Sequence, residues 1–187
     1  MPLQKARLSI KRFLLWIRPF LRLLQKFRGS PQAIAGGFSL GLFLALTPTV
    51  GVQLIIAVFL ATLFKLSRPA TLLAVMVTNP LTVPPIFTFN YWVGSLFFDG
   101  PSVREVYGHL LGIAAEMAKM NIWEVGAQMR AFVDIGQDML IPLVFGSLLM
   151  AVLVGAFSYV LLVRFLWFLK LHKERKRVRK SRDQSNN

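Results

Sequence analysis

The chain has 187 residues, 55% of them hydrophobic, and carries a formal net charge of +14 at pH 7. Three runs without a charged side chain, 33–64, 69–98 and 139–163, each exceed the ~20 residues that an α-helix needs to cross a bilayer core. The composition therefore excludes an ordinary soluble domain and predicts an all-α integral membrane protein. The chain has no cysteine and only two histidines, so disulfides and thiolate metal sites are excluded, and neither a metal nor a cofactor is expected.

Residues 1–31 form the first predicted unit, a basic amphipathic helix that lies on the membrane surface. Their charged side chains are all cations. Within 11–28, Phe13, Ile17 and Phe20 share one face while most cations share the other, which is the pattern typical of interfacial helices. The sequence Gly29-Ser30-Pro31 is expected to end this helix.

Residues 32–165 form the predicted membrane domain, a small helical bundle in which small residues recur every four positions in two of the apolar runs. These residues are Ala33, Gly37, Gly41 and Ala45 in the first run, and Ser147, Ala151 and Gly155 in the third. Such spacing lets neighbouring helices approach closely, so we expect the two faces to pack together. The alternative is that both faces point at lipid.

The first apolar run, 33–64, is interrupted at "TPTVG" by Pro48 and Gly51. As helices, the two pieces would each span about 20 Å, less than the ~30 Å of a bilayer core. The run is therefore expected either to kink or to enter the membrane, turn and leave on the same side. Cations at both flanks, Arg28 before the run and Lys65 and Arg68 after it, favour the re-entrant arrangement.

The second run, 69–98, is interrupted in the same way by "TNPLTVPP" at 78–85, because each proline removes a backbone donor and restricts the residue before it. Broken backbone at membrane depth is tolerated only where it is buried in protein or lines a wet cavity. In carriers, paired interrupted helices place their N-termini at the substrate site, where free N–H groups suit an anionic group.

The polar residues near the two breaks are therefore the candidate site. The predicted substrate-binding residues are Thr47, Pro48, Thr49, Gly51, Gln53, Asn79, Pro80, Thr82 and Asn90, and the cations predicted to attract a headgroup at the cytoplasmic mouth are Arg28, Lys65 and Arg68. The alternative is that the polar groups at the breaks only satisfy one another within the bundle.

Residues 102–138 are predicted to form two amphipathic helices, which begin at a capping box "SVRE" (102–105) and at "NIWE" (121–124). Residues 139–163 are a predicted transmembrane helix, and 166–187 a basic cytoplasmic tail that should be disordered from 181 onward. Cations near both ends of the chain place both termini in the cytoplasm, and the more acidic 99–138 on the far side. The tail is expected to meet anionic lipid headgroups rather than nucleic acid, because no aromatic residues are interleaved with its last cations.

Several spaced marks within about residues 30–165 give the chain a family resemblance. They are Gly37 and Gly41, the Pro-x-x-Gly-x-Gln of Pro48, Gly51 and Gln53, the Asn-Pro-x-Thr of Asn79, Pro80 and Thr82, and Gly94. With them the chain resembles domain-of-unknown-function family 2062 of bacterial membrane proteins. The resemblance implies no settled activity. Some relatives are joined to glycosyltransferase domains, which implies a link to lipid-linked sugar or envelope metabolism, but this sequence contains no such domain.

The leading hypothesis is a multi-pass protein of the bacterial inner membrane that transports or flips a lipid or another anionic amphiphile, as a transporter or as its subunit. The competing hypothesis is a structural or assembly protein that recruits partners and uses the helix breaks for packing only. An enzyme is not expected, because the apolar runs contain no acid, base or metal ligand. The expected partners are membrane lipids with anionic headgroups and either a second copy of the chain or an envelope-assembly protein, but not nucleic acid.

Overall fold

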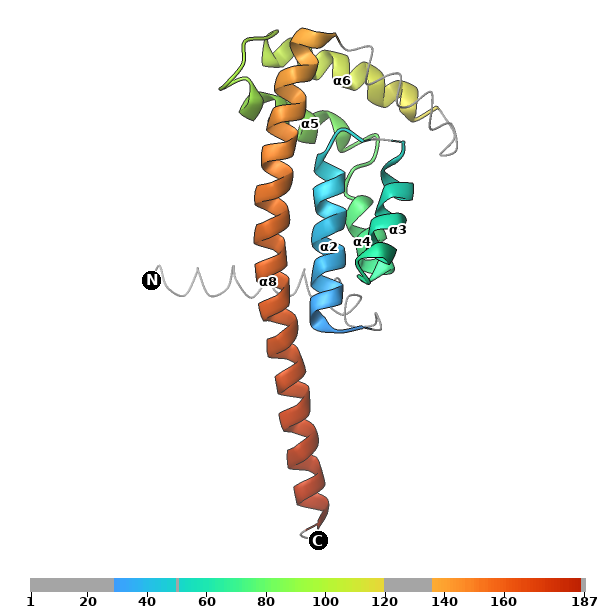
Figure 1. Ribbon diagram of the computed structural model, residues 1–187, viewed down its shortest axis with the longest axis vertical. Coiled ribbons are helices and arrows are strands. Elements are labelled where there is room, and N and C mark those ends of the chain that lie inside the picture. The colour runs from blue at the N-terminus through green and yellow to red at the C-terminus, as the bar shows by residue number, and fades with distance from the viewer. Residues whose placement is uncertain (1–28, 50, 120–135, 186–187) are drawn as a thin grey trace, which may run out of the picture.

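The structure is a computed structural model that describes residues 29–49, 51–119 and 136–185, with side chains up to Leu171. The described residues form six α-helices and no strand (Figure 1). The helices are α2 (Pro31–Leu46), α3 (Gln53–Leu63), α4 (Arg68–Val75), α5 (Val83–Gly94), α6 (Val103–Met117) and α8 (Gln137–Ser185). The all-helical prediction is confirmed for these residues. The predicted interfacial helix within 11–28 and the second amphipathic helix after Asn121 lie outside the described residues.

Helix α8 is the long axis of the molecule, and both α2 and α5 pack along it (Figure 1). It begins two residues before the predicted transmembrane run and continues past that run as far as Ser185, so 181–185, predicted to be disordered, belong to the helix. By length and composition, α8 is long and apolar enough over Gln137–Leu171 to cross a membrane, whereas α2 and α3 are apolar but shorter.

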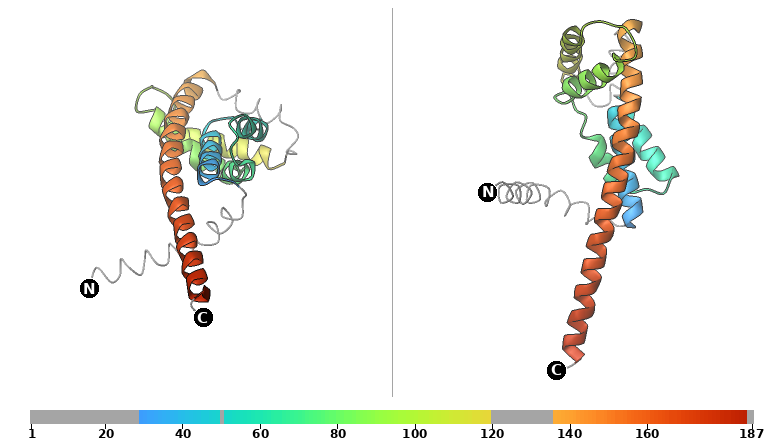
Figure 2. Two further views of the ribbon diagram at one scale, coloured as in Figure 1. Left: turned by 60° about the horizontal axis from the view of Figure 1, so that its bottom comes forward. Right: turned by 90° about the vertical axis from the view of Figure 1, so that its left-hand side faces the viewer.

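Helices α2, α3 and α4 stand side by side next to the middle of α8 and are seen nearly end-on in the left view of Figure 2. Helix α2 begins where the Ser30 side chain accepts a hydrogen bond from the Ala33 amide (3.1 Å), as expected of a serine N-cap. It ends at Leu46, because Thr47 adopts an extended backbone conformation. The next residue is a proline, which has no N–H to continue the helix. The two helices α2 and α3 then form a hairpin around the turn at 47–52.

The small residues of α2 and α8 do not form one shared seam, which corrects the sequence-based expectation. A Cβ atom on Gly41 would overlap the Thr71 carbonyl, so this face of α2 packs against α4. Gly155 of α8 instead lies beside the Ser39 carbonyl and the Phe43 side chain, on another face of α2. The helices α2 and α8 do pack together, but the helix that approaches the glycine face of α2 most closely is α4. Three helices share the surface of α2, so each meets a different face.

A second core joins α5, α6 and the start of α8. The buried side chains of this core are Val83, Phe87, Tyr91, Val106, Leu110, Ile113, Met117, Met139 and Leu143. Helix α6 begins as its capping box predicts, with the Ser102 hydroxyl accepting from the Glu105 amide (3.4 Å). The right view of Figure 2 shows this core at one end of α8 and the free end of α8 far from it.

The outer surface of α3 and α8 carries large apolar side chains. Phe59 on α3 is 63% exposed and Phe157 on α8 is 70% exposed, and Ile55, Leu63, Leu148 and Val152 are also exposed. Large apolar side chains exposed in this number on two helices are typical of contact with a membrane or with another protein. The fold therefore leaves an apolar exterior around a bundle that is itself packed through small residues.

Candidate functional site: the two helix breaks

The first break, 47–52, is a tight turn held by its own threonines. The Thr47 hydroxyl donates to the Leu44 carbonyl (2.9 Å) and lies 3.3 Å from the Thr49 hydroxyl. Gly51 has φ +92°, in the region that favours glycine, and it lets the chain reverse into α3. Thr47, Pro48, Thr49 and Gly51 are all half-buried, so the turn lies at the surface of the bundle rather than within it.

The second break, 76–82, is closed by hydrogen bonds between Asn79 and Thr82. The Asn79 side-chain oxygen accepts from the amides of Leu81 (3.0 Å) and Thr82 (3.2 Å). In return the Thr82 hydroxyl accepts from the Asn79 amide (2.9 Å) and donates to the Val77 carbonyl (2.6 Å). Pro80 is half-buried within this turn. The polar groups of the second break therefore satisfy one another locally.

Gln53 brings the two breaks together. It is the first residue of α3 and is buried, and its Nε2 donates to the hydroxyl of the buried Thr78 (3.4 Å). The Thr78 hydroxyl also donates to the Val75 carbonyl at the end of α4 (3.1 Å). This contact joins the two breaks, and the prediction that they line one substrate site stays a prediction.

Asn90 ties the first break to α5 and α8. Its side-chain amide donates to the Leu46 carbonyl at the end of α2 (3.1 Å) and to the Ser147 hydroxyl of α8 (3.1 Å). The side chain is only 1% exposed. The carbonyls in the last turn of a helix have no partner within the helix, and here Asn90 supplies one. A single residue thus clamps three helices.

The N-terminus of α5 offers no free amide in its first turn, which differs from the expected anion site. The Val83 amide donates to the Asn79 carbonyl (2.9 Å), and the Ile86 amide donates to the Thr82 carbonyl (3.1 Å). The two residues between them, Pro84 and Pro85, have no N–H to offer. The helix dipole is present at this end, but the donors that would hold an anion are already used or missing.

The predicted headgroup cations lie away from the breaks, at the other end of α3 and α4. Lys65 is exposed in the loop after α3 with φ +53°, and Arg68 is exposed as the first residue of α4. Arg28 lies outside the described residues. Between these cations, the Ser67 hydroxyl is buried without a hydrogen-bond partner, while its amide donates to the Ala33 carbonyl (3.0 Å). The cations and the polar breaks therefore occupy opposite ends of the three-helix group.

Sequence reasoning missed Thr78 and Ser147 as members of this polar cluster. Thr78 had a signal, because it precedes Asn79-Pro80 directly, and a hydroxyl before a turn often bonds local backbone. Ser147 was recognised only as a small residue, and nothing local in the sequence pairs it with Asn90.

The arrangement supplies neutral hydrogen-bond donors and acceptors and no titratable group. Within the part of the chain that the structure describes, no group of three His, Asp or Glu side chains could hold a metal ion. The breaks can therefore form hydrogen bonds through backbone, amide and hydroxyl groups. Most of these groups are already hydrogen-bonded to one another.

The model of a bacterial family described as "Uncharacterized protein conserved in bacteria (DUF2062)" matches residues 14–177. No curated protein and no solved structure matches the chain.

Proposed function

The chain belongs to DUF2062, a family of uncharacterised bacterial proteins, and from its geometry we propose a multi-pass membrane protein with a structural role. The helix breaks serve packing, and the basic ends hold the protein to anionic lipids and to an assembly partner. The role is not catalytic. This is the second of the two hypotheses from the sequence, and the carrier hypothesis stays a prediction.

The membrane location is supported by α8 and by the exposed apolar surface. Over Gln137–Leu171, α8 is long and apolar enough to span a bilayer. The exposed side chains of α3, such as Phe59 and Leu63, would meet lipid on the same bundle. In the proposed topology, α2 and α3 form a hairpin that enters from the cytoplasm, turns at the far edge of the hydrocarbon and returns, the α4–α5 segment crosses once, and α8 returns. Both termini then lie on the cytoplasmic side of the inner membrane.

The packing role rests on one observation, the pair of hydrogen bonds that Asn90 donates. A carrier site needs polar groups left free for its cargo, whereas the Asn90 amide binds Leu46 and Ser147. Hydrogen bonds between helices in membranes contribute about 0.6 kcal/mol on average. Their loss costs more when a buried acceptor is left unsatisfied, about 1–3 kcal/mol. Asn90 is therefore expected to hold the fold rather than a substrate.

The proposal is tested by Asn90→Leu, with Thr49→Val as the matched control. Asn90→Leu removes both bonds and should lower the free energy of unfolding by about 1–2 kcal/mol. Thr49→Val removes one hydroxyl at the half-buried turn and should change the free energy by less than about 0.5 kcal/mol. Unfolding is followed by circular dichroism in a mild detergent, and the phospholipid that copurifies with each variant is measured per chain.

The structural role predicts equal phospholipid content in the wild type and in Thr49→Val, with a clear loss of stability in Asn90→Leu. The carrier hypothesis predicts a different pattern, in which Thr49→Val loses phospholipid while stability is kept. That second pattern would refute the packing role.

A further inference from the structure

Aromatic side chains gather on the outside of α5 and the adjoining part of α8. The rings of Phe97 and Phe98, just after α5, contact Phe145 of α8 edge-on, with centroid distances of 5.3 and 5.1 Å. Trp92 of α5 is 46% exposed and lies 5.7 Å from the ring of Phe89. These five residues form the upper aromatic group.

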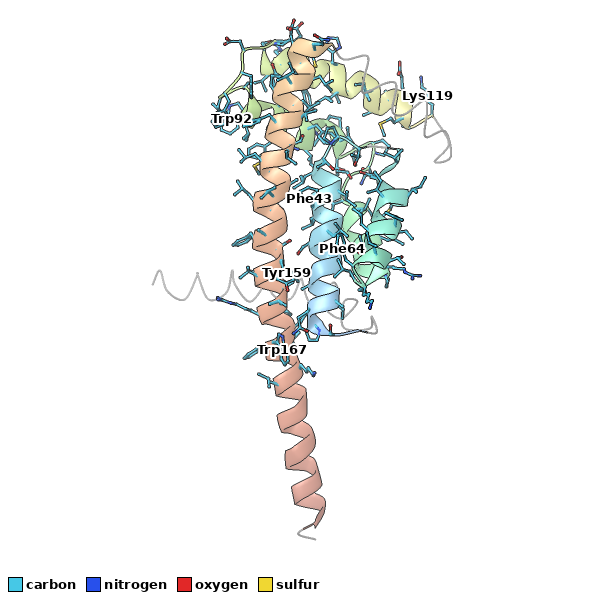
Figure 3. The ribbon with its side chains drawn as sticks, in the orientation of Figure 1. Phe43, Phe64, Trp92, Lys119, Tyr159 and Trp167 are labelled. Atoms are coloured by element: carbon cyan, nitrogen blue, oxygen red, sulfur yellow. The ribbon has the colours of Figure 1, made fainter. Side chains whose placement is uncertain are left out.

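A second aromatic level lies far along α8. The Lys170 ammonium sits over the Trp167 ring, 5.2 Å from its centroid, and Arg164 is exposed nearby on the same helix. Leu166 packs in one cluster with Ile34 from the first turn of α2, so this level is also where α2 begins. Figure 3 shows Trp92 and Trp167 at well-separated heights along the molecule.

The separation of the two levels matches a bilayer. At ~1.5 Å per residue, the helix rises about 33 Å from Phe145 to Trp167, and a bilayer core is ~30 Å thick. The sequence from Phe145 to Val163 carries no charged residue. Tryptophan, tyrosine and basic residues are enriched where a protein crosses from hydrocarbon to headgroups.

We propose that the bilayer occupies the surface between these two levels, with the upper aromatic group in one headgroup region and Trp167 with Lys170 in the other. The partner of this surface is the lipid bilayer itself. The inference rests on the proposed membrane location and adds the depth of every element. It places the exposed faces of α3 and of the middle of α8 in hydrocarbon.

This placement moves the helix breaks away from the membrane centre. Ser147, which binds Asn90, lies about 30 Å along α8 from Trp167, so the first break sits at the edge of the hydrocarbon near the upper aromatic group. Helix α2 alone spans about 24 Å from the Trp167 level to that edge. The turn 47–52 therefore lies where backbone groups can reach headgroups and water, rather than at the midplane, where carriers hold their substrates.

The depth is measured with single-tryptophan variants of the full chain in phosphatidylcholine vesicles. Trp16, Trp92, Trp123 and Trp167 are replaced by phenylalanine except for one retained reporter. Fluorescence is quenched with lipid brominated either near the headgroup or near the end of the acyl chain. We expect Trp92 and Trp167 each to be quenched about twofold more strongly by the shallow bromine.

The control places the only tryptophan at Leu153→Trp, on the exposed face of α8 between the two levels, where the deep bromine should quench more strongly. Phe97→Trp, with the four native tryptophans replaced by phenylalanine, is a second reporter of the upper level, because Phe97 contacts Phe145 there. Stronger quenching of Trp92 and Phe97→Trp by the deep bromine would overturn the proposed depth while the membrane location stands. An absence of quenching at every position would overturn both.

Discussion

At the scale of single residues, the crossing of α5 and α8 depends on two glycines that bring backbone against backbone. A Cβ atom on Gly94 would overlap the Pro142 carbonyl, and one on Gly146 would overlap the Asn90 carbonyl. Backbone cannot swing aside as a flexible side chain can, so neither position has room for a methyl group. The same close approach lets Asn90 reach Ser147.

Gly94→Ala is expected to destabilise the fold, because the added methyl group must push α5 away from α8. Overpacking of this kind costs about 1–3 kcal/mol. Gly108→Ala on α6 is the control, because nothing lies within 4 Å of its Cβ position and alanine is favoured over glycine within a helix by about 0.5–1 kcal/mol. The measurement is the denaturant midpoint in detergent. Equal midpoints for the two variants would mean that α5 and α8 do not cross at Gly94.

At the scale of helices, α2 presents different faces to α4 and to α8. Gly37 and Gly41 lie against the backbone of α4 around Ser67 and Thr71, while Ser39 bonds Ser158 of α8 through their hydroxyls (3.0 Å). Small residues thus have different uses on the two helices. The glycines of α2 are needed for close contact, and Gly155 of α8 has space beside it.

Two alanine substitutions separate these uses. Gly41→Ala should destabilise the fold by about 1–3 kcal/mol, since its Cβ atom would overlap the Thr71 carbonyl. Gly155→Ala should be neutral or stabilising, because its Cβ atom would meet neighbours at 3.7 Å, an ordinary contact, and helix propensity favours alanine. Thermal unfolding in detergent compares them. A large loss of stability in Gly155→Ala would mean that α2 and α8 do meet in the tight seam that the sequence suggested.

At the scale of the whole molecule, cations and breaks lie at opposite ends of the three-helix group. Lys65 and Arg68 stand at one end, and the turns 47–52 and 76–82 at the other, where Gln53 bonds Thr78. In a membrane, this separation gives the group two chemically different ends. Because the chain has no cysteine, a single introduced cysteine can report on each end.

Lys65→Cys and Leu81→Cys should react with a membrane-impermeant thiol reagent from opposite sides. Leu81 is 85% exposed at the second break, and Lys65 is also exposed. Leu81→Cys is expected to react in intact cells, and Lys65→Cys only after permeabilisation, because cations favour the cytoplasmic side. Leu111→Cys on α6 is a control for the side of Leu81. Equal reaction of both cysteines in intact cells would contradict the proposed topology.

The sequence by itself determined the helical class, the first break and the start of α6, but it placed Val83–Pro85 within the second break, whereas these residues begin α5. Proline and glycine interrupt helices through local sterics, and a serine caps a helix through bonds three residues away, so neighbouring residues suffice to predict them. The same local chemistry predicted an interruption at Asn79-Pro80, where Asn79 and Thr82 close a turn in the structure.

Only the tertiary structure decided which faces meet and what the polar residues bind. Asn90 finds Leu46 and Ser147 across long stretches of chain, and the glycines of α2 meet α4 rather than α8. The spacing of residues along a helix fixes the face they share but carries no information about the helix opposite. That choice is made by packing among all the helices at once, because each close contact leaves less surface for the others.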